Sequence, residues 1–359
     1  MWKFGKSDKS KQEKLLQEAL TEPAPSSVVE GENSITKRVI FVILMLLVGF
    51  YFLGVYWSIE PDMFDVNDSG AYISQGQDKR LIVGYTTVKT TERVATALMQ
   101  KNGGFLSNDI LPPSIFLDNI PSWEFGALVQ IRDMASSLRN DMSRSQSQSL
   151  ENESLKKAEP LFNIDHTSWQ LPRAEGEYSE GVEYLAAYRK KLMSKSNAQD
   201  QFYARADNLN SWLELVNKRL GGLSQRLSAS VGQDRLNTDL AGDTAALQST
   251  RTSSHLEVKT PWLQIDDTFY EARGACWALI HFLKAVQVDF APVLEKKNAE
   301  ASLAQIIREL EATQETMWSP MVLNGGGFGV VANHSLVMAN YISRANAGLI
   351  DLRELLTKG

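Results

Sequence analysis

Residues 265–293 read IDDTFYEARGACWALIHFLKAVQVDFAPV and carry the clearest apolar repeat of the chain. Alternating steps of four and three residues separate the apolar positions Ile265, Phe269, Ala272, Cys276, Leu279, Leu283, Val286, Phe290 and Val293. This spacing keeps one side of an α-helix apolar over about 40 Å, at about 1.5 Å per residue. Because such a stripe must be buried, the pattern predicts a long helix packed against other helices. Thr260 and Pro261 are expected to begin this helix, and Pro292 is expected to kink or stop it.

Three further segments repeat this spacing. The second stripe is Ala206, Leu209, Leu213, Val216, Leu220, Leu223 and Leu227; the third is Leu128, Ile131, Ala135, Leu138 and Met142; the fourth is Val337, Tyr341, Ala345, Gly348, Leu352 and Leu355. Shorter helices are expected within residues 87–101, 181–193 and 299–317, whereas residues 80–88 and 110–120 are the only candidates for extended chain. The sequence therefore predicts an all-α fold: an elongated antiparallel helical bundle with few or no strands.

A second kind of apolar segment lies near the N-terminus. Residues 39–57 read VIFVILMLLVGFYFLGVYW, and no charged residue occurs from Val39 through Ile59. An α-helix of this length crosses a hydrocarbon core of about 30 Å. The run lacks the polar stripe of a core helix, and it exceeds the about 7–15 apolar residues of a cleavable signal peptide. These features favour an uncleaved transmembrane signal anchor, with residues 39–57 in the lipid bilayer.

Charges on either side of this segment predict its orientation. Lys37 and Arg38 precede it, and Glu60 and Asp62 follow it, so the positive-inside rule places the N-terminus in the cytoplasm. We expect a mostly disordered cytoplasmic tail over residues 1–36, the transmembrane anchor over residues 37–59 and a periplasmic α-helical domain over residues 60–359. That domain is expected to form one unit or two subdomains, with a flexible excursion near residues 232–259.

Composition excludes several classes of function. The chain has 37 Lys and Arg against 43 Asp and Glu, a formal net charge of −6 at pH 7, whereas a dedicated nucleic-acid binder needs basic charge. The chain has one cysteine, Cys276, which excludes an intramolecular disulfide framework and a cysteine-rich metal site. No cofactor and no nucleic-acid partner are expected, and homo-oligomerisation is left open.

The residues to test first for chemistry lie in the helix predicted at 265–293. Asp267 and Glu271 are four residues apart and face one way, so with Asp266 they could hold a divalent cation or form an acid/base pair. The simpler interpretation is that these carboxylates complement the helix dipole and pair with Arg273 or another cation. His281 does not share a face with Glu271. The sequence therefore assigns no catalytic, cofactor-binding or metal residue, and leaves these four as candidates.

Two other features were weighed. The loop NGGGFG at residues 324–329 fits part of a dinucleotide-binding fingerprint, but a helical pattern precedes it where the fingerprint needs a strand, which favours a turn between helices. Trp123, Trp212, Trp262 and Trp318 lie near predicted helix ends or polar turns, and some of them are expected to be exposed contacts for a partner.

Four long stretches resemble one known family. They are LSNDILPPSIFLDNIPSWEFGALVQIRDMASSLRNDMSRSQSQS at 106–149, FYARADNLNSWLELV at 202–216, RLGGLSQRLSASVGQ at 219–233 and ANHSLVMANYISRANAGLIDLRELL at 332–356. They are similar to a family of uncharacterised single-pass inner-membrane proteins of proteobacteria, a domain of unknown function. The resemblance implies a location in the bacterial inner membrane and carries no activity or site residue.

These observations favour one function and leave two alternatives. The favoured function is a non-enzymatic, inner-membrane-anchored periplasmic helical scaffold or adaptor that acts with protein partners in a complex of the cell envelope. The first alternative is an envelope hydrolase or metal-binding enzyme with a site between helices. The second is an extracytoplasmic sensory or ligand-binding bundle, which would need a signalling partner subunit.

Overall fold

The computed structural model describes residues 11, 13–15, 17, 27–67, 72–75, 78–145, 150–194, 200–236 and 255–358. The chain divides into two compact units, Met1–Leu53 and Gly54–Gly359. Helix α2 (Ser27–Trp57) provides most of the described part of the first unit, and its stretch Ile35–Trp57 is long and apolar enough to cross a membrane. The side chains of residues 35–53 are exposed around the whole helix, which is unlike the core helix of a soluble protein.

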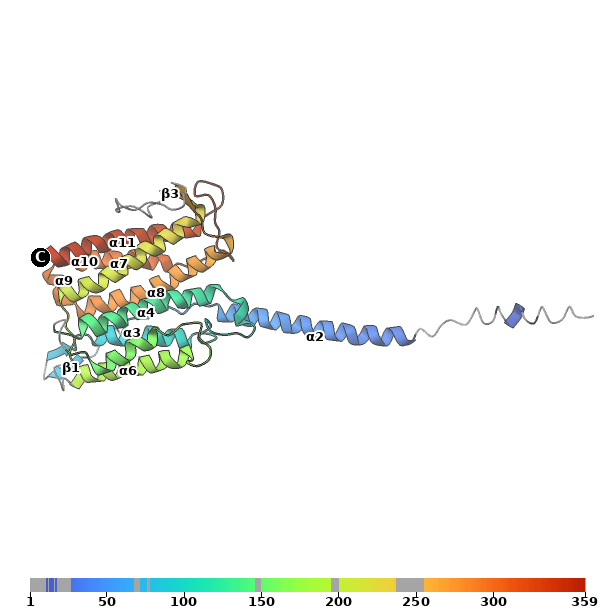
Figure 1. Cartoon of the computed structure of the whole chain (residues 1–359), viewed down its shortest axis with the longest axis horizontal. Coiled ribbons are helices and arrows are strands. Elements are labelled where there is room, and N and C mark those ends of the chain that lie inside the picture. Colours follow the sequence, from blue (N-terminus) through green and yellow to red (C-terminus); the bar gives the residue numbers. More distant parts are fainter. Residues whose placement is uncertain are drawn as a thin grey trace, which may run out of the picture. The chain divides into compact units, whose positions relative to one another are not determined.

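The second unit is a bundle of helices (Figure 1). The helices are α3 (Tyr85–Gln100), α4 (Asn119–Ser137), α5 (Glu153–Phe162), α6 (Ala174–Ser194), α7 (Ala206–Ser228), α8 (Ile265–Asp289), α9 (Ala291–Lys296), α10 (Glu300–Glu311) and α11 (His334–Lys358). Strands β1 (Tyr72–Gln75) and β2 (Asp78–Leu81) form one antiparallel pair, and β3 (Gln233–Leu236) and β4 (His255–Val258) form another. The prediction of an all-α fold with few strands is confirmed.

Neighbouring helices run antiparallel across most of the bundle. Arg353 near the end of α11 lies 3.2 Å from Glu214 in the first half of α7, while Ser343 bonds Ser224 near the end of α7. In the same way, Arg189 in the second half of α6 bonds Glu92 in the first half of α3. The connections between helices therefore gather at two ends of the bundle (Figure 1).

One end contains the last turn of α2 and is called here the α2 end. It comprises residues 54–59 and four connections between helices. These are residues 101–118, residues 163–173, the described parts 229–236 and 255–264 of the connection between α7 and α8, and residues 312–333. A methyl group at Gly103 would lie 2.7 Å from Trp57 Cγ, so the turn at Gly103 receives the Trp57 ring. Asn108 donates to the Ser168 carbonyl at 3.1 Å, and Asn324 to the Ser230 carbonyl at 3.0 Å, so these connections adjoin one another in pairs. The opposite end is called the far end.

Helices α4 and α8 run parallel and approach until their backbones touch. A methyl group at Gly126 of α4 would lie 1.9 Å from the Glu271 carbonyl oxygen, and one at Gly274 of α8 would lie 2.0 Å from the Trp123 carbonyl oxygen. Beside this contact the rings of Trp123 and Trp277 lie 5.1 Å apart and are buried. Two glycines thus allow the two most apolar helices of the bundle to form the centre of the core.

Helix α3 corrects the expectation of extended chain at residues 80–88. Strand β2 ends at Leu81, and Gly84, with a φ of 84°, begins the helix at Tyr85. Asp289 at the end of α8 accepts hydrogen bonds from the Thr87 amide at 2.6 Å and the Thr87 hydroxyl at 2.7 Å, and so caps α3 from another helix. Burial of this threonine-rich face outweighs its local preference for strand.

The prediction of extended chain at residues 110–120 is also wrong. Pro112 and Pro113 stay outside a helix as expected, but the chain then forms the 3₁₀ turn Ser114–Phe116 and enters α4 at Asn119. Asp118 caps this helix by accepting from the Asn119 amide at 3.0 Å. A capped helix start therefore replaces the expected extended chain.

The buried face of α11 and the positions of Pro261 and Pro292 can be compared with the prediction from the sequence. In α11 the buried face is Met338, Ala339, Ile342, Ala345, Leu349, Leu352 and Leu356. Val337 and Leu355 of the predicted stripe are exposed, because α11 packs against both α7 and α10 and its buried face is centred about one residue later. Pro261 precedes the 3₁₀ turn Trp262–Gln264 rather than α8 itself, and Pro292 lies in the first turn of α9, where α8 has stopped as expected.

Two predicted flexible segments are only partly described. The tail over residues 1–36 falls largely outside the described residues. The excursion near residues 232–259 begins with β3 and ends with β4, which pair from Gln233 with Val258 to Leu236 with His255, and residues 237–254 lie outside the described part.

The close approach of α4 and α8 gives a direct test of the fold. We expect Gly126→Ala to lower the free energy of unfolding by about 1–3 kcal/mol or more, because the methyl group would overlap the Glu271 carbonyl. Gly222→Ala is the matched control: no atom lies within 4 Å of its Cβ position, so alanine should raise stability by about 0.5–1 kcal/mol. Denaturant titration of the full chain in detergent, followed by circular dichroism, measures both; equal stabilities would contradict the packing described.

Candidate functional site

The acidic residues Asp266, Asp267 and Glu271 lie in the first two turns of α8, and Asp267 and Glu271 have separate partners. Ser122 donates to Asp267 at 3.1 Å, and burial raises the pKa of Asp267. Glu271 accepts two hydrogen bonds from Arg226 of α7, at 2.7 and 2.5 Å. The sequence predicted pairing with Arg273 or another cation; Arg226 is that other cation, and Arg273 faces Glu60 at 2.7 Å instead. Among the described residues no group of three or more His, Cys, Asp or Glu side chains is placed to hold a metal ion.

His281 lies away from these carboxylates and joins the chain after α2 to the bundle. Its Nε2 accepts from the Phe64 amide at 3.1 Å, its Nδ1 donates to the Trp277 carbonyl at 2.7 Å, and its ring stacks on Phe64 at 3.8 Å. Burial lowers the pKa of His281 to about 4, so the ring is neutral at pH 7. His281 therefore holds the segment around Phe64 against α8. The four candidate residues do not converge on one site.

The segment from Gly54 to Val66 is packed along the bundle at several points. Glu60 pairs with Arg273, which also donates to the backbone carbonyls of Thr313 and Glu315, each at 2.9 Å. Arg93 lies over the Phe64 ring at 4.1 Å from its centroid, and Val66 is buried. The chain that follows α2 is thus part of the bundle's core and surface rather than a separate linker.

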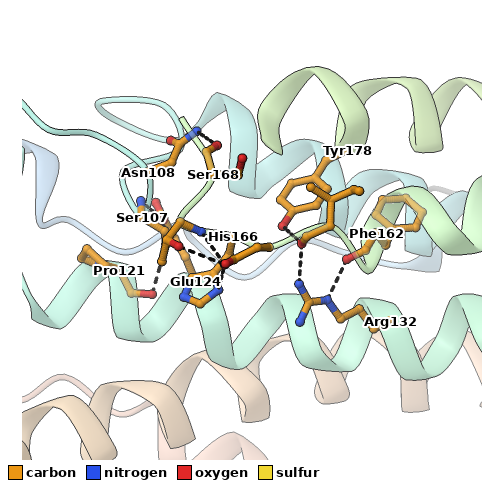
Figure 2. A network of polar contacts seen from close by, with 12 residues as sticks. Ser107, Asn108, Pro121, Glu124, Arg132, Phe162, His166, Ser168 and Tyr178 are labelled. Atoms are coloured by element: carbon orange, nitrogen blue, oxygen red, sulfur yellow. Dashed lines mark hydrogen bonds and ion pairs between the residues drawn. The ribbon is translucent and has the colours of Figure 1, made fainter. Parts of the chain in front are cut away.

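A buried polar network at the α2 end was not foreseen from the sequence (Figure 2). Glu124 of α4 is fully buried and accepts hydrogen bonds from the Leu106 amide at 2.9 Å, the Ser107 amide at 2.8 Å and the Ser107 hydroxyl at 2.5 Å. Its Oε1, which accepts from the Leu106 amide, also lies 2.7 Å from Lys101 Nζ. Burial raises the pKa of Glu124, and the Lys101 charge opposes that rise.

The same network continues to the next connection along α4 (Figure 2). Arg132 donates to the carbonyls of Phe162 at 2.7 Å and Ile164 at 2.8 Å, and the Tyr178 hydroxyl donates to the Ile164 carbonyl at 2.8 Å. Glu124 therefore holds the backbone at Leu106 and Ser107, and the partly buried Arg132 holds the backbone at Phe162 and Ile164. The only signal in the sequence was a lone glutamate inside the apolar run that begins at Trp123.

Three cavities are lined by arginines that already have carboxylate partners. The first, of about 350 Å³, lies between α4, α7 and α8 beside Arg219 and Arg226, which pair with Asp133 and Glu271. The second, of about 320 Å³, lies at the α2 end between Arg273 and Trp318. The third, of about 520 Å³, lies between α10 and α11 beside Arg344, which pairs with Glu309.

The most distinctive feature of the α2 end is a set of exposed apolar side chains, called here the apolar surface. It consists of Ile110, Leu111, Ile115, Phe116, Trp169, Leu171, Leu236, Trp262, Leu263, Trp318, Met321, Phe328, Val330 and Val331, each about half-exposed or more. All four connections of the α2 end contribute. In the described connections of the far end, the large apolar side chains with comparable exposure are Val83, Leu150 and Met193.

The tryptophans noted in the sequence divide between core and surface. Trp123 and Trp212 are 0% and 1% exposed, whereas Trp262 and Trp318 are 77% and 92% exposed. Position near a helix end therefore did not distinguish the two groups. The two exposed tryptophans both belong to the apolar surface, and they are the part of this site that the sequence indicated.

Fold and site together define a helical-bundle protein with one helix long and apolar enough to cross a membrane and an apolar surface at the end that receives this helix's last turn. A model of the family described as "Uncharacterized protein conserved in bacteria (DUF2333)" matches residues 30–359, so the chain belongs to this bacterial family. The resemblance to a domain of unknown function is thereby confirmed. No curated protein and no solved structure matches the chain.

The buried pair of Lys101 and Glu124 predicts a large effect of one substitution. Lys101→Met leaves the Glu124 carboxylate buried without its cation, which should cost about 3–5 kcal/mol of unfolding free energy. Lys358→Met, which removes the exposed pair with Glu354, should cause no measurable change. Urea titration of both variants in detergent gives the comparison, and a Lys101 variant as stable as the Lys358 variant would show that the pair does not hold the connection.

The buried His281 predicts a pH dependence of known sign. Because its pKa in the folded chain is about 4, below the ordinary 6.5, its contribution is complete above pH 6.5 and is lost as the pH falls. Lowering the pH from 7 to 5 should lower the free energy of unfolding by about 2 kcal/mol through the titration of His281. Glutamine does not titrate, so the stability of His281→Gln should fall less than that of the native chain between pH 7 and pH 5. Thermal denaturation of both proteins at the two pH values measures this difference. An unchanged loss would contradict this assignment; Asp289, whose pKa burial raises to about 6, titrates in both proteins and cancels.

Proposed function

We propose that the protein is a scaffold or adaptor of the bacterial cell envelope, anchored in the inner membrane by α2 and carrying its helical bundle in the periplasm. The observation that carries this proposal is the packing of residues 54–66 onto the bundle. An enzyme that only needs to stay near a membrane works on a flexible linker. Here Trp57, Glu60 and Phe64 hold the chain against α8 and the turn at Gly103.

Charge supports the proposed orientation. Lys37 and Arg38 precede the apolar stretch and Glu60 and Asp62 follow it, which is the distribution of a helix with its N-terminus in the cytoplasm. Membership of a bacterial family supports the inner membrane as the site of insertion.

Fixed attachment favours a scaffold for a physical reason. A bundle held at a defined distance from the bilayer meets membrane partners at a raised effective concentration, and a fixed geometry avoids the entropy cost of ordering a linker on binding. The hydrolase alternative named Asp266, Asp267, Glu271 and His281. The last three contact Ser122, Arg226 and Phe64 respectively, and these contacts give it no support.

Two measurements on the full chain test this proposal. A phosphatase reporter fused to the C-terminus should be active, since this enzyme matures only in the periplasm. A flexible glycine-serine linker inserted after Ile59 should leave the protein in the membrane but lower the recovery of cross-linked envelope proteins by about tenfold or more, because it removes the fixed geometry.

The matched control carries the same linker within residues 21–26, ahead of α2, and should recover partners like the native chain. Circular dichroism of both insertions establishes that the bundle is intact. A reporter active only in the cytosol, or equal recovery with both insertions, would reject the proposed function.

A further inference from the structure

We propose that the apolar surface rests in the interfacial layer of the lipid bilayer, so that lipid is the partner of the α2 end. This inference rests on the proposed function, because it takes α2 as the membrane span. It adds a second, independent contact with the membrane, made by side chains far apart in the sequence.

The first support is the position of the surface relative to the end of the span. The stretch Ile35–Trp57 has 23 residues and measures about 34 Å as a helix, which places Trp57 near the boundary of a hydrocarbon core of about 30 Å. Gly54, one turn earlier, contacts Leu117, since a methyl group there would lie 3.5 Å from Leu117 Cδ2. The neighbouring Phe116 is exposed and belongs to the apolar surface, which therefore begins one residue from the span's own contact.

The second support is the kind of side chain and the way it is presented. Phe328 and Val330 are fully exposed at the tip of the connection 312–333. Asn333 holds the base of this tip by donating to Asn324 Oδ1 at 2.8 Å and to the Gly325 carbonyl at 2.7 Å, while Gly327 adopts a φ of 79°. The glycine-rich loop noted in the sequence is thus a turn that holds an aromatic and an aliphatic side chain out to solvent.

The charges near the apolar surface indicate whether attraction to anionic lipid or burial of apolar area drives its contact with the membrane. The described connections of the α2 end carry four Lys or Arg residues, Lys101, Arg173, Arg235 and Lys259, of which Lys101 is buried against Glu124 and Arg173 pairs with Glu175. The same connections carry Asp109, Asp118, Asp165, Asp234, Glu257 and Glu315. Attraction to anionic headgroups therefore does not drive the contact, and burial of apolar area does. Tryptophan and phenylalanine are the residues that favour the interface of a bilayer.

The side chains of the apolar surface all lie at one end of the bundle, which favours contact with lipid over exposure to water. An apolar area built from four connections at a single end is the feature that marks contact with another phase or molecule. The far end of the same bundle lacks such an area in its described connections. A protein partner on this surface is the competing occupant, and the experiment below separates the two.

The test measures the depth of a spin label on the full chain in nanodiscs of phosphatidylcholine. Phe328→Cys places the label on the apolar surface, and Leu150→Cys places it on an equally apolar, exposed position at the far end. The native Cys276 is buried, so the unsubstituted chain provides the unlabelled control. The label at 328 should be more accessible to oxygen than to a water-soluble nickel chelate, as expected about 5–10 Å into the interface. The label at 150 should show the reverse.

The outcomes separate this inference from the proposed function. Extraction of the protein by alkaline carbonate would reject α2 as a span and with it the proposed function. Retention in the membrane with an aqueous label at 328, as at 150, would reject only the lipid contact. A label aqueous in nanodiscs but shielded in native membranes would assign the surface to a protein partner and overturn the inference. An interfacial label that anionic phosphatidylglycerol does not shift deeper would support it.

Discussion

The backbone contact between α4 and α8 is the constraint on which the bundle depends. With Gly126 and Gly274 facing each other, two long apolar helices lie side by side and parallel, and Trp123 and Trp277 fill the space beside them. Helices α3, α5, α7, α10 and α11 then pack against one or both members of this pair, and α6 packs on α3 and α5. Since α8 contacts α3, α4, α7, α10 and α11, its middle stretch, residues 274–283, is buried and contains no Asp, Glu, Lys or Arg. His281 is accordingly neutral, and it bonds the chain that arrives from α2.

The parts of the fold that the sequence predicted are those governed by local periodicity. Helices α4, α7 and α8 each bury one continuous stripe, so steps of three and four residues located them. Helix α3 was read as extended chain at its start because its buried face is rich in threonine, and its N-terminal cap, Asp289, lies 202 residues away. In α11 two neighbouring helices widen the buried face, and the stripe was displaced by about one residue.

The candidate site depends on contacts that periodicity does not record. Glu124 and Lys101 are separated by 23 residues and a turn, and only their shared burial shows that they form one network. The apolar surface comes from four connections without a repeat, and of its members the sequence singled out Trp262 and Trp318. The antiparallel order of the helices brings these connections to one end. The last turn of α2, residues 54–57, packs at the same end, so the fold itself assembles the surface beside that turn.

The central claim is that this bundle stands on the membrane by the end that receives α2. Neutron reflectometry of the full chain in a supported bilayer measures where protein density begins above the lipid. If the apolar surface rests in the bilayer as proposed, protein density starts within the outer headgroup layer. A layer of water between the headgroups and the protein would contradict it.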